Sequence, residues 1–320
     1  MRAAFLEQYG TPNIELREIE KPIPEDDEAL VRVQASSVNP ADWYAVAGRP
    51  YVGRAAMGLR KPRSRRLGVD FAGTVEAVGK DVTHVQPGDD VFGGRSGAYA
   101  EYVCVKNAIV RMPGNITFQE AGAVGVAGLT ALQALRDKGH VQPGQKVLVN
   151  GASGGVGTFA VQIAKALGAD VTGVCSTRNV DLVRSLGADH VVDYTREDFT
   201  QRGDRFDLVL DIAGSRSWSQ LKRVLTPEAT VVIVGAPKGT PILGPLGHVI
   251  RMKAAGIFSS QRVVFFVAKF NREDMQTLAD LLESGAIRSV VERTYPLTEL
   301  AAALDHLGEG HAKAKIVVTM

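Results

Sequence analysis

The chain has 320 residues, which is long for one hydrophobic core and favours two domains. Apolar residues make up 45% and charged residues 22% of it, the balance of an ordinary globular protein. The net charge of +2 excludes bulk attraction to nucleic acid or to a membrane surface.

The two cysteines, Cys104 and Cys175, each lie in an apolar, strand-like run. This setting favours buried thiols over a disulfide pair, and therefore a reducing compartment. Residues 1–10 lack the apolar core of a signal peptide, and nowhere do 18 uncharged apolar residues follow one another. We therefore expect a cytoplasmic protein that does not span a membrane.

Up to about residue 122, short alternating runs such as ALVRVQASSV are separated by turn clusters such as QPGDD, which is typical of a β-rich module. Beyond it, strand-like and helix-like segments alternate. A strand at 146–150 precedes a helix at 156–168, and a strand at 170–175 precedes a helix at 179–187. This order predicts βαβ units and a parallel sheet covered on both faces. From about residue 271 an amphipathic helix is followed by short strands ending in AKIVVTM.

A glycine-rich segment joins the first of these strands to its helix. It reads Ala152-Ser153-Gly154-Gly155-Val156-Gly157, the dinucleotide fingerprint with alanine at its first glycine position. Gly154 would let a pyrophosphate approach the main chain, and Gly157 would let the helix pack closely on the strand, while the N–H groups at the helix start receive the anion. A tight turn without ligand is the alternative, but four glycines in the seven residues 151–157 exceed what a turn needs. The predicted cofactor contacts are Ser153, Gly154, Gly155, Val156 and Gly157.

The end of the next strand indicates which dinucleotide binds. An NAD site places an acidic residue there, whereas an NADP site places arginine or small polar residues around the 2′-phosphate. The segment CSTRN contains Ser176 and Arg178 and no carboxylate, which favours NADPH. A solvated surface position is the alternative for Arg178. Tyr194, after the third strand, is predicted to close over the adenine or its phosphate, with core packing as the alternative.

Nearly the whole chain resembles the medium-chain dehydrogenase/reductase superfamily, in its zinc-lacking, zeta-crystallin-like quinone oxidoreductase branch. The matching segments are SSVNPADW, LGVDFAGTVEAVGKDV, QPGDDVFG, GAYAEYV, GLTALQAL, VLVNGASGGVG, LGADHVVDY and HAKAKIVV. The resemblance implies a GroES-like catalytic domain from residues 1–121 and 271–320, with a Rossmann NADP-binding domain, 122–270, inserted in it. It also implies an active site in the cleft between them and a homodimer. The changes of texture near residues 122 and 271 agree with this layout.

Zinc-dependent members of the superfamily carry a cysteine three residues before an aspartate, and a Gly-His-Glu motif. Here Asn39 precedes Asp42, and the second motif reads Gly68-Val69-Asp70. A catalytic zinc needs about three protein ligands, so we expect no metal. The histidines are scattered without ligand spacing and are interpreted as surface or packing residues: His84, His140, His190, His248, His306 and His311.

Without a metal to stabilise an alkoxide, hydride transfer is easiest to an acceptor that spreads its own charge, such as a quinone or an α,β-unsaturated carbonyl. Asn39 and Tyr44 are the candidate catalytic residues, as hydrogen-bond donors to the developing oxyanion. Packing beside Trp43 is the alternative for Tyr44. The resemblance further implies cofactor contacts at Thr130, Gly235, Phe258 and Lys313.

A basic loop, residues 60–66, precedes the second motif. It contains Arg60, Lys61, Arg63, Arg65 and Arg66. We interpret it as a solvated loop, although clustered arginines also bind phosphate or nucleic acid. The leading hypothesis is an NADPH-dependent reductase of a small quinone or enone. The alternatives are a zinc-free carbonyl or alcohol oxidoreductase, and an NADPH-binding protein whose basic loop binds RNA or another acidic partner.

Overall fold

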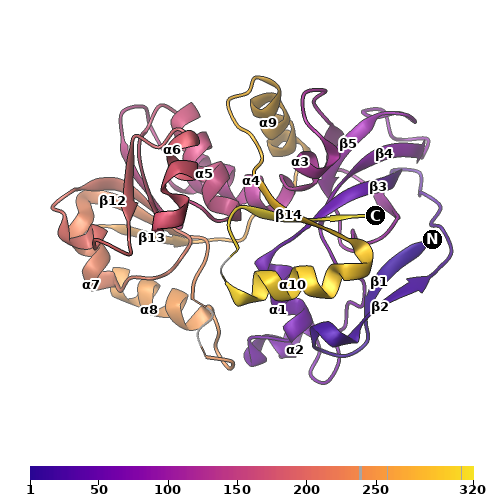
Figure 1. Cartoon of the computed structure of the whole chain (residues 1–320), viewed down its shortest axis with the longest axis horizontal. Coiled ribbons are helices and arrows are strands. Elements are labelled where there is room, and N and C mark those ends of the chain that lie inside the picture. The colour runs from indigo at the N-terminus through magenta and orange to yellow at the C-terminus, as the bar shows by residue number, and fades with distance from the viewer. Residues whose placement is uncertain (238–239, 258, 311) are drawn as a thin grey trace. The chain divides into compact units, whose positions relative to one another are not determined.

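The computed structural model describes residues 1–237, 240–257, 259–310 and 312–320. The chain divides into two compact units (Figure 1). Unit 1 consists of Met1–Leu129 and Lys269–Met320, and unit 2 of Thr130–Ala268. Unit 1 is therefore built from both ends of the chain, with unit 2 inserted between them.

Unit 1 is β-rich, and β3 is at the centre of its main sheet. The sheet runs in the order β14-β15-β3-β4-β5-β7, and β6 also pairs with β3. Because β15 lies between β14 and β3, the last strand of the chain completes a sheet that the N-terminal residues begin. The strands of unit 1 are β1 (Arg2–Leu6), β2 (Ile14–Glu18), β3 (Ala29–Val38), β4 (Asp70–Val78), β5 (Asp90–Gly94), β6 (Tyr102–Val105), β7 (Ile109–Arg111), β14 (Val291–Pro296) and β15 (Lys315–Thr319).

The helices of unit 1 begin and end at recognisable residues. α1 starts after Asn39 with a proline in its first turn, and Gly48 ends it in the left-handed conformation, φ 59°. Figure 1 shows α10 beside α1, and both pack their apolar residues into one cluster with β15. The helices are α1 (Pro40–Ala47), α2 (Arg54–Met57), α3 (Phe118–Gly122), α9 (Arg272–Glu283) and α10 (Leu300–Glu309), and α4 (Gly125–Gln133) runs over the boundary after Leu129.

Unit 2 is a doubly wound parallel sheet in the order β10-β9-β8-β11-β12-β13. Its central strands are valine- and leucine-rich and largely buried, as a sheet covered on both faces requires. The prediction of a Rossmann domain beside a GroES-like domain is therefore confirmed. The elements are β8 (Lys146–Asn150), α5 (Gly155–Ala166), β9 (Asp170–Cys175), α6 (Val180–Ser185), β10 (His190–Asp193), β11 (Phe206–Asp211), α7 (Trp218–Leu221), β12 (Leu225–Ile233), α8 (Leu246–Gly256) and β13 (Arg262–Phe265).

The strand order reverses between β8 and β11, because β9 and β10 continue on one side and β12 and β13 on the other. In such sheets, ligands bind outside the carboxyl ends of the strands at this reversal. Asn150 ends β8 and Asp211 ends β11, and the Asn150 Nδ2 donates to Asp211 Oδ1 at 2.8 Å. The carboxyl edge of unit 2 is thus where its ligand site is expected.

Two further predictions concern the thiols and the membrane. Cys104 and Cys175 are both free, and Cys175 is buried while Cys104 is only partly so. None of the described helices combines the length and the apolar character needed to cross a membrane.

Candidate functional site

A buried carboxylate, that of Asp70 at the start of β4, organises the polar cluster of unit 1. Its side chain is fully shielded from solvent, with 0% exposed. Oδ1 accepts from the Val126 backbone N–H at 2.7 Å, and Oδ2 accepts from Ser37 Oγ at 2.7 Å and from Asn39 Nδ2 at 2.9 Å. Three donors therefore stabilise the negative charge in a place that water does not reach.

Lys315, the first residue of β15, supplies the nearest cation. It is only 3% exposed, and its Nζ donates to Asn39 Oδ1 at 2.7 Å and lies 3.7 Å from Asp70 Oδ2. Burial lowers the pKa of the Lys315 ammonium, while the charges of Asp70 and Asp42 oppose that shift. A buried lysine is tolerated only with such partners.

The Asn39 amide is held from both ends. Its oxygen accepts from Lys315, and its Nδ2 donates to Asp70 and, at 3.3 Å, to the Ser37 carbonyl. The residue is 2% exposed. Both amide hydrogens thus have acceptors inside unit 1. Donation to a substrate oxyanion would cost one of these bonds.

Asp42 is a second buried acid beside the first. Its Oδ2 accepts from the Asn39 backbone N–H at 2.9 Å and from the Tyr99 hydroxyl at 3.0 Å. Burial, and next the charge of Asp70, raise the pKa of Asp42 to about 6. The hydrogen bonds from Asn39 and Tyr99 and the charge of Lys315 oppose that shift without cancelling it.

Tyr44 lies on α1, half-buried, with its ring edge-on to Trp43 at a centroid distance of 5.1 Å. Within the described part of the chain, nothing forms a hydrogen bond with its phenol. Burial raises the pKa of Tyr44, so the hydroxyl stays protonated at neutral pH. It is therefore a donor for which the described residues supply no acceptor.

The residues at the two metal motifs do not fit a catalytic zinc. Among the described residues, no three His, Cys, Asp or Glu side chains are grouped as metal ligands. The Lys315 ammonium also contacts Asn39 and approaches Asp70, and a second cation there would be repelled.

In unit 2 the glycine-rich segment has one glycine that the fold needs and one that it does not. A Cβ on Gly157 would lie 2.1 Å from the Gly151 carbonyl oxygen, so glycine is required for α5 to pack against the segment before it. A Cβ on Gly154 would meet only that same oxygen, at 3.5 Å. Gly154 precedes α5 and leaves its first N–H groups without a side-chain cap. A bare main chain at a helix start suits an approaching phosphate.

Asn179 links the glycine-rich segment to the end of β9, a role that the sequence analysis missed. Its Nδ2 donates to Ser153 Oγ at 3.0 Å and to Ser176 Oγ at 3.2 Å. Its Oδ1 is buried and has no hydrogen-bond partner among the residues that the structure describes. A ligand hydroxyl or amino group would satisfy that acceptor. Together with Gly154, this orphan atom makes the residues present fit a dinucleotide.

Tyr194 follows β10, and its backbone N–H donates to the Cys175 carbonyl at 3.0 Å. It is 55% exposed, so the alternative of core packing is wrong. Arg178 is also exposed, at the end of β9. The structure thus brings Ser176, Arg178 and Tyr194 to the same carboxyl edge of the sheet as the glycine-rich segment.

An acid near this edge was also missed. Asp193, the last residue of β10, accepts from Thr177 Oγ1 at 2.5 Å and from Thr195 Oγ1 at 2.7 Å, and Arg196 lies 3.4 Å away. These partners hold the pKa of Asp193 below its ordinary value, with the Thr177 hydrogen bond as the largest cause. The dinucleotide fingerprint does not find Asp193, because it considers only the residues at the end of β9.

His248 on α8 lies at the reversal of the sheet, where it is a packing residue rather than a surface one. Its Nε2 is 3.6 Å from Asp211 Oδ2, and both atoms are buried without a hydrogen-bond partner among the described residues. The sequence does not indicate that His248 and Asp211 meet, because nearly forty residues separate them.

The remaining predicted contacts are dispersed. Thr130 is half-buried on α4. Gly235 needs to be glycine because a Cβ would lie 2.1 Å from the Ile212 carbonyl oxygen, which chain packing alone explains. Lys313 is exposed, and its backbone N–H donates to Glu292 at 2.8 Å. Phe258 lies outside the described residues. The roles of all four stay predictions.

Comparisons with known proteins agree with this architecture. Residues 25–114 match the family described as alcohol dehydrogenase GroES-like domain, and residues 186–318 match that described as zinc-binding dehydrogenase. Quinone-oxidoreductase QR1, chloroplastic, of Triphysaria versicolor is 33% identical over 99% of this chain and 98% of that protein. The chain belongs to the medium-chain dehydrogenase/reductase superfamily, in its quinone oxidoreductase branch.

Other members of this superfamily bear on its chemistry. Trans-enoyl reductase pgmF of Aspergillus terreus is 36% identical over 91% of this chain and 86% of that protein. Escherichia coli quinone oxidoreductase complexed with NADPH superposes with a TM-score of 0.81 at 25% identity, covering all of both chains. The chain described here is therefore an NAD(P)H-dependent oxidoreductase that uses a nicotinamide cofactor.

In this oxidoreductase, Asp42→Asn should change how stability depends on pH. Between about pH 4 and pH 6 the folded wild type holds a proton on Asp42 that the unfolded chain has released, so its stability falls as the pH rises through about 6. Asparagine cannot ionise. The variant should gain on the order of 1–3 kcal/mol relative to the wild type between pH 4.5 and 7.5. Urea unfolding of both proteins at the two pH values measures this, and a pH-independent difference would contradict it.

Proposed function

We propose that the protein reduces a quinone or an α,β-unsaturated carbonyl with NADPH and without a metal. The observation that carries the proposal is the buried cluster at the metal motifs, where the Lys315 ammonium and the Asn39 amide stand in place of a metal and its ligand. With no Lewis acid, the acceptor must spread its own negative charge as hydride arrives.

The cofactor would be held by unit 2. NADPH supplies the hydride. The N–H groups at the start of α5 would receive the pyrophosphate, with Gly154 leaving room for it. Ser176 and the exposed Arg178 would receive the 2′-phosphate, and Tyr194 would cover the adenine. Asp193 is already engaged by two threonines and Arg196, which reduces its repulsion of that phosphate.

The catalytic donor would be the Tyr44 phenol. Its hydroxyl is protonated and has no described partner, so it can donate to the oxyanion that develops on the acceptor. We assign Asn39 a positioning role, because both hydrogens of its amide are already used. Through Asp42 and Lys315 it fixes the first turn of α1, the helix that carries Tyr44.

A homodimer is part of the proposal. β13 is the last strand of the sheet in unit 2 and pairs only with β12 among the described strands. An open strand edge of this kind is usually covered, and a second copy of the chain would cover it. The proposed location remains the reducing cytoplasm, since both cysteines are free.

Arg178→Ala should discriminate the two nicotinamide cofactors. A charge-assisted hydrogen bond to the 2′-phosphate is worth roughly tenfold to a hundredfold in affinity, so NADPH should bind that much more weakly while NADH is nearly unaffected. Titration calorimetry with each cofactor measures this. Arg184→Ala, an exposed position on α6, is the matched control and should change neither affinity. Equal affinity of the wild type for NADPH and NADH would reject the preference.

Tyr44→Phe should lower turnover by roughly 100-fold or more, the scale on which one oxyanion donor acts, with little change in KM. The assay is NADPH oxidation with one quinone and one enone, using protein dialysed against a strong chelator. Tyr51→Phe, at an exposed tyrosine, should keep full activity. Loss of wild-type activity on chelation, or its restoration by zinc, would overturn the metal-free reaction. Unchanged turnover in Tyr44→Phe would remove that residue from it.

A further inference from the structure

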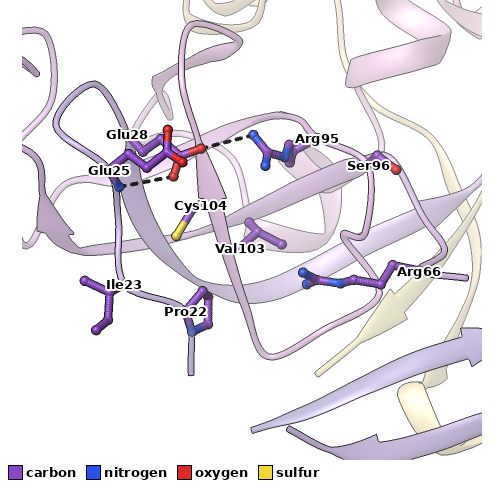
Figure 2. A pocket seen from close by; sticks show the side chains of 9 residues that line it. All are labelled: Pro22, Ile23, Glu25, Glu28, Arg66, Arg95, Ser96, Val103 and Cys104. Atoms are coloured by element: carbon purple, nitrogen blue, oxygen red, sulfur yellow. Dashed lines mark hydrogen bonds and ion pairs between the residues drawn. The ribbon is translucent and has the colours of Figure 1, made fainter. Parts of the chain in front are cut away.

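A cavity of about 180 Å³ lies in unit 1 and contains none of the residues of the polar cluster around Asp70. Figure 2 shows the residues that line it, among them Arg66, Arg95, Ser96, Glu28 and Cys104. Arg66 is the last residue of the basic loop, and Arg95 and Ser96 follow β5. Two guanidinium groups from separate segments therefore face one small space.

The carboxylates of the cavity are already engaged. Glu28 is 5% exposed, and its Oε1 accepts from Arg95 Nη1 at 3.3 Å while Oε2 accepts from the Glu25 backbone N–H at 3.2 Å. Both contacts are drawn in Figure 2. Glu25 pairs with Lys106 at 3.0 Å. Glu28 thus pairs with Arg95 and Glu25 with Lys106, so neither glutamate forms an ion pair with Arg66.

Arg66 differs from the other basic residues of its loop in its burial. Arg60, Lys61 and Arg63 are exposed, and Arg65 pairs with Glu7 at 3.2 Å. These four residues agree with the interpretation of a solvated loop. The half-buried fifth one does not.

The Arg66 guanidinium has no counter-charge in the part of the chain that the structure describes. There its Nη2 donates to the Gly97 carbonyl, at 3.4 Å, and its Nε is buried with no acceptor. No described carboxylate forms an ion pair with it. Burial, followed by the charge of Arg95, lowers the pKa of Arg66. A guanidinium partly withdrawn from water without an anion is destabilised, and a bound anion would offset that loss.

We propose that this cavity binds a small oxyanion, a phosphate or a short carboxylate, between Arg66 and Arg95. A planar guanidinium recognises either group with two parallel hydrogen bonds, and Ser96 also lines the cavity. The Cys104 thiol adds no competing charge, because burial raises its pKa. Pro22 and Val103 supply apolar walls on which the carbon chain of a short carboxylate packs. The site is independent of the proposed reductase activity.

Thermal unfolding of the full chain tests the proposal. Potassium phosphate or sodium propionate is added at constant ionic strength to a chloride buffer at pH 7. The wild-type Tm should rise by roughly 2–5 °C at ten times the dissociation constant of the probe. Arg66→Met should abolish the rise and, in chloride alone, should be at least as stable as the wild type. Arg63→Met removes a charge from the same loop outside the cavity and should keep the rise. Arg66→Gln replaces Arg66→Met if the latter does not fold.

The two probes separate the sources of the anion. A rise with phosphate alone assigns a phosphoryl group, and a rise with propionate alone assigns a carboxylate. No rise with either probe would overturn the proposal. So would a phosphate rise that survives in Arg66→Met and vanishes in Arg178→Ala, because the phosphate would then occupy the cofactor site.

Discussion

The charge of Asp70, held without water, is the constraint on which unit 1 depends. Its oxygens accept from Ser37 in β3, from Asn39 ahead of α1 and from Val126 on α4, with the Lys315 ammonium of β15 close by. The three donors come from the N-terminal part of the chain and the ammonium from its C-terminal end. Withdrawing a carboxylate from water costs several kcal/mol unless such partners repay it, so the segments that supply them must converge for the unit to be stable.

The same cluster limits the chemistry. The Lys315 ammonium contacts Asn39 of the first motif and lies 3.7 Å from Asp70 of the second, so a positive charge at this place is covalently part of the chain. The ammonium interacts with Asp70 and Asn39 and is therefore not available to a substrate oxygen. In the proposed reaction the donor to the substrate is the Tyr44 phenol, a weaker electrophile than a metal ion. This is why we propose acceptors that delocalise their own charge as the substrates.

Local patterns in the sequence predicted the parallel sheet and the glycine-rich segment, because the spacing of strands, helices and glycines is written within a few tens of residues. The polar cluster could not be predicted in this way. Lys315 and Asn39 are 276 residues apart, and only the pairing of β15 with β3 brings them together. The sequence analysis chose Lys313 for the tail. The structure leaves that side chain exposed and buries Lys315, and this distinction depends on the strand partner rather than on the sequence.

A double-mutant cycle on Asp70→Asn and Lys315→Met tests the central claim most directly, with the free energy of unfolding as the measured quantity. Each single variant leaves a buried group without its partner and should lose about 3–5 kcal/mol. The double variant removes both charges and should lose at least about 1 kcal/mol less than the two single losses combined. Losses that add to within about 0.5 kcal/mol would show that the two charges do not depend on each other, and would contradict the account.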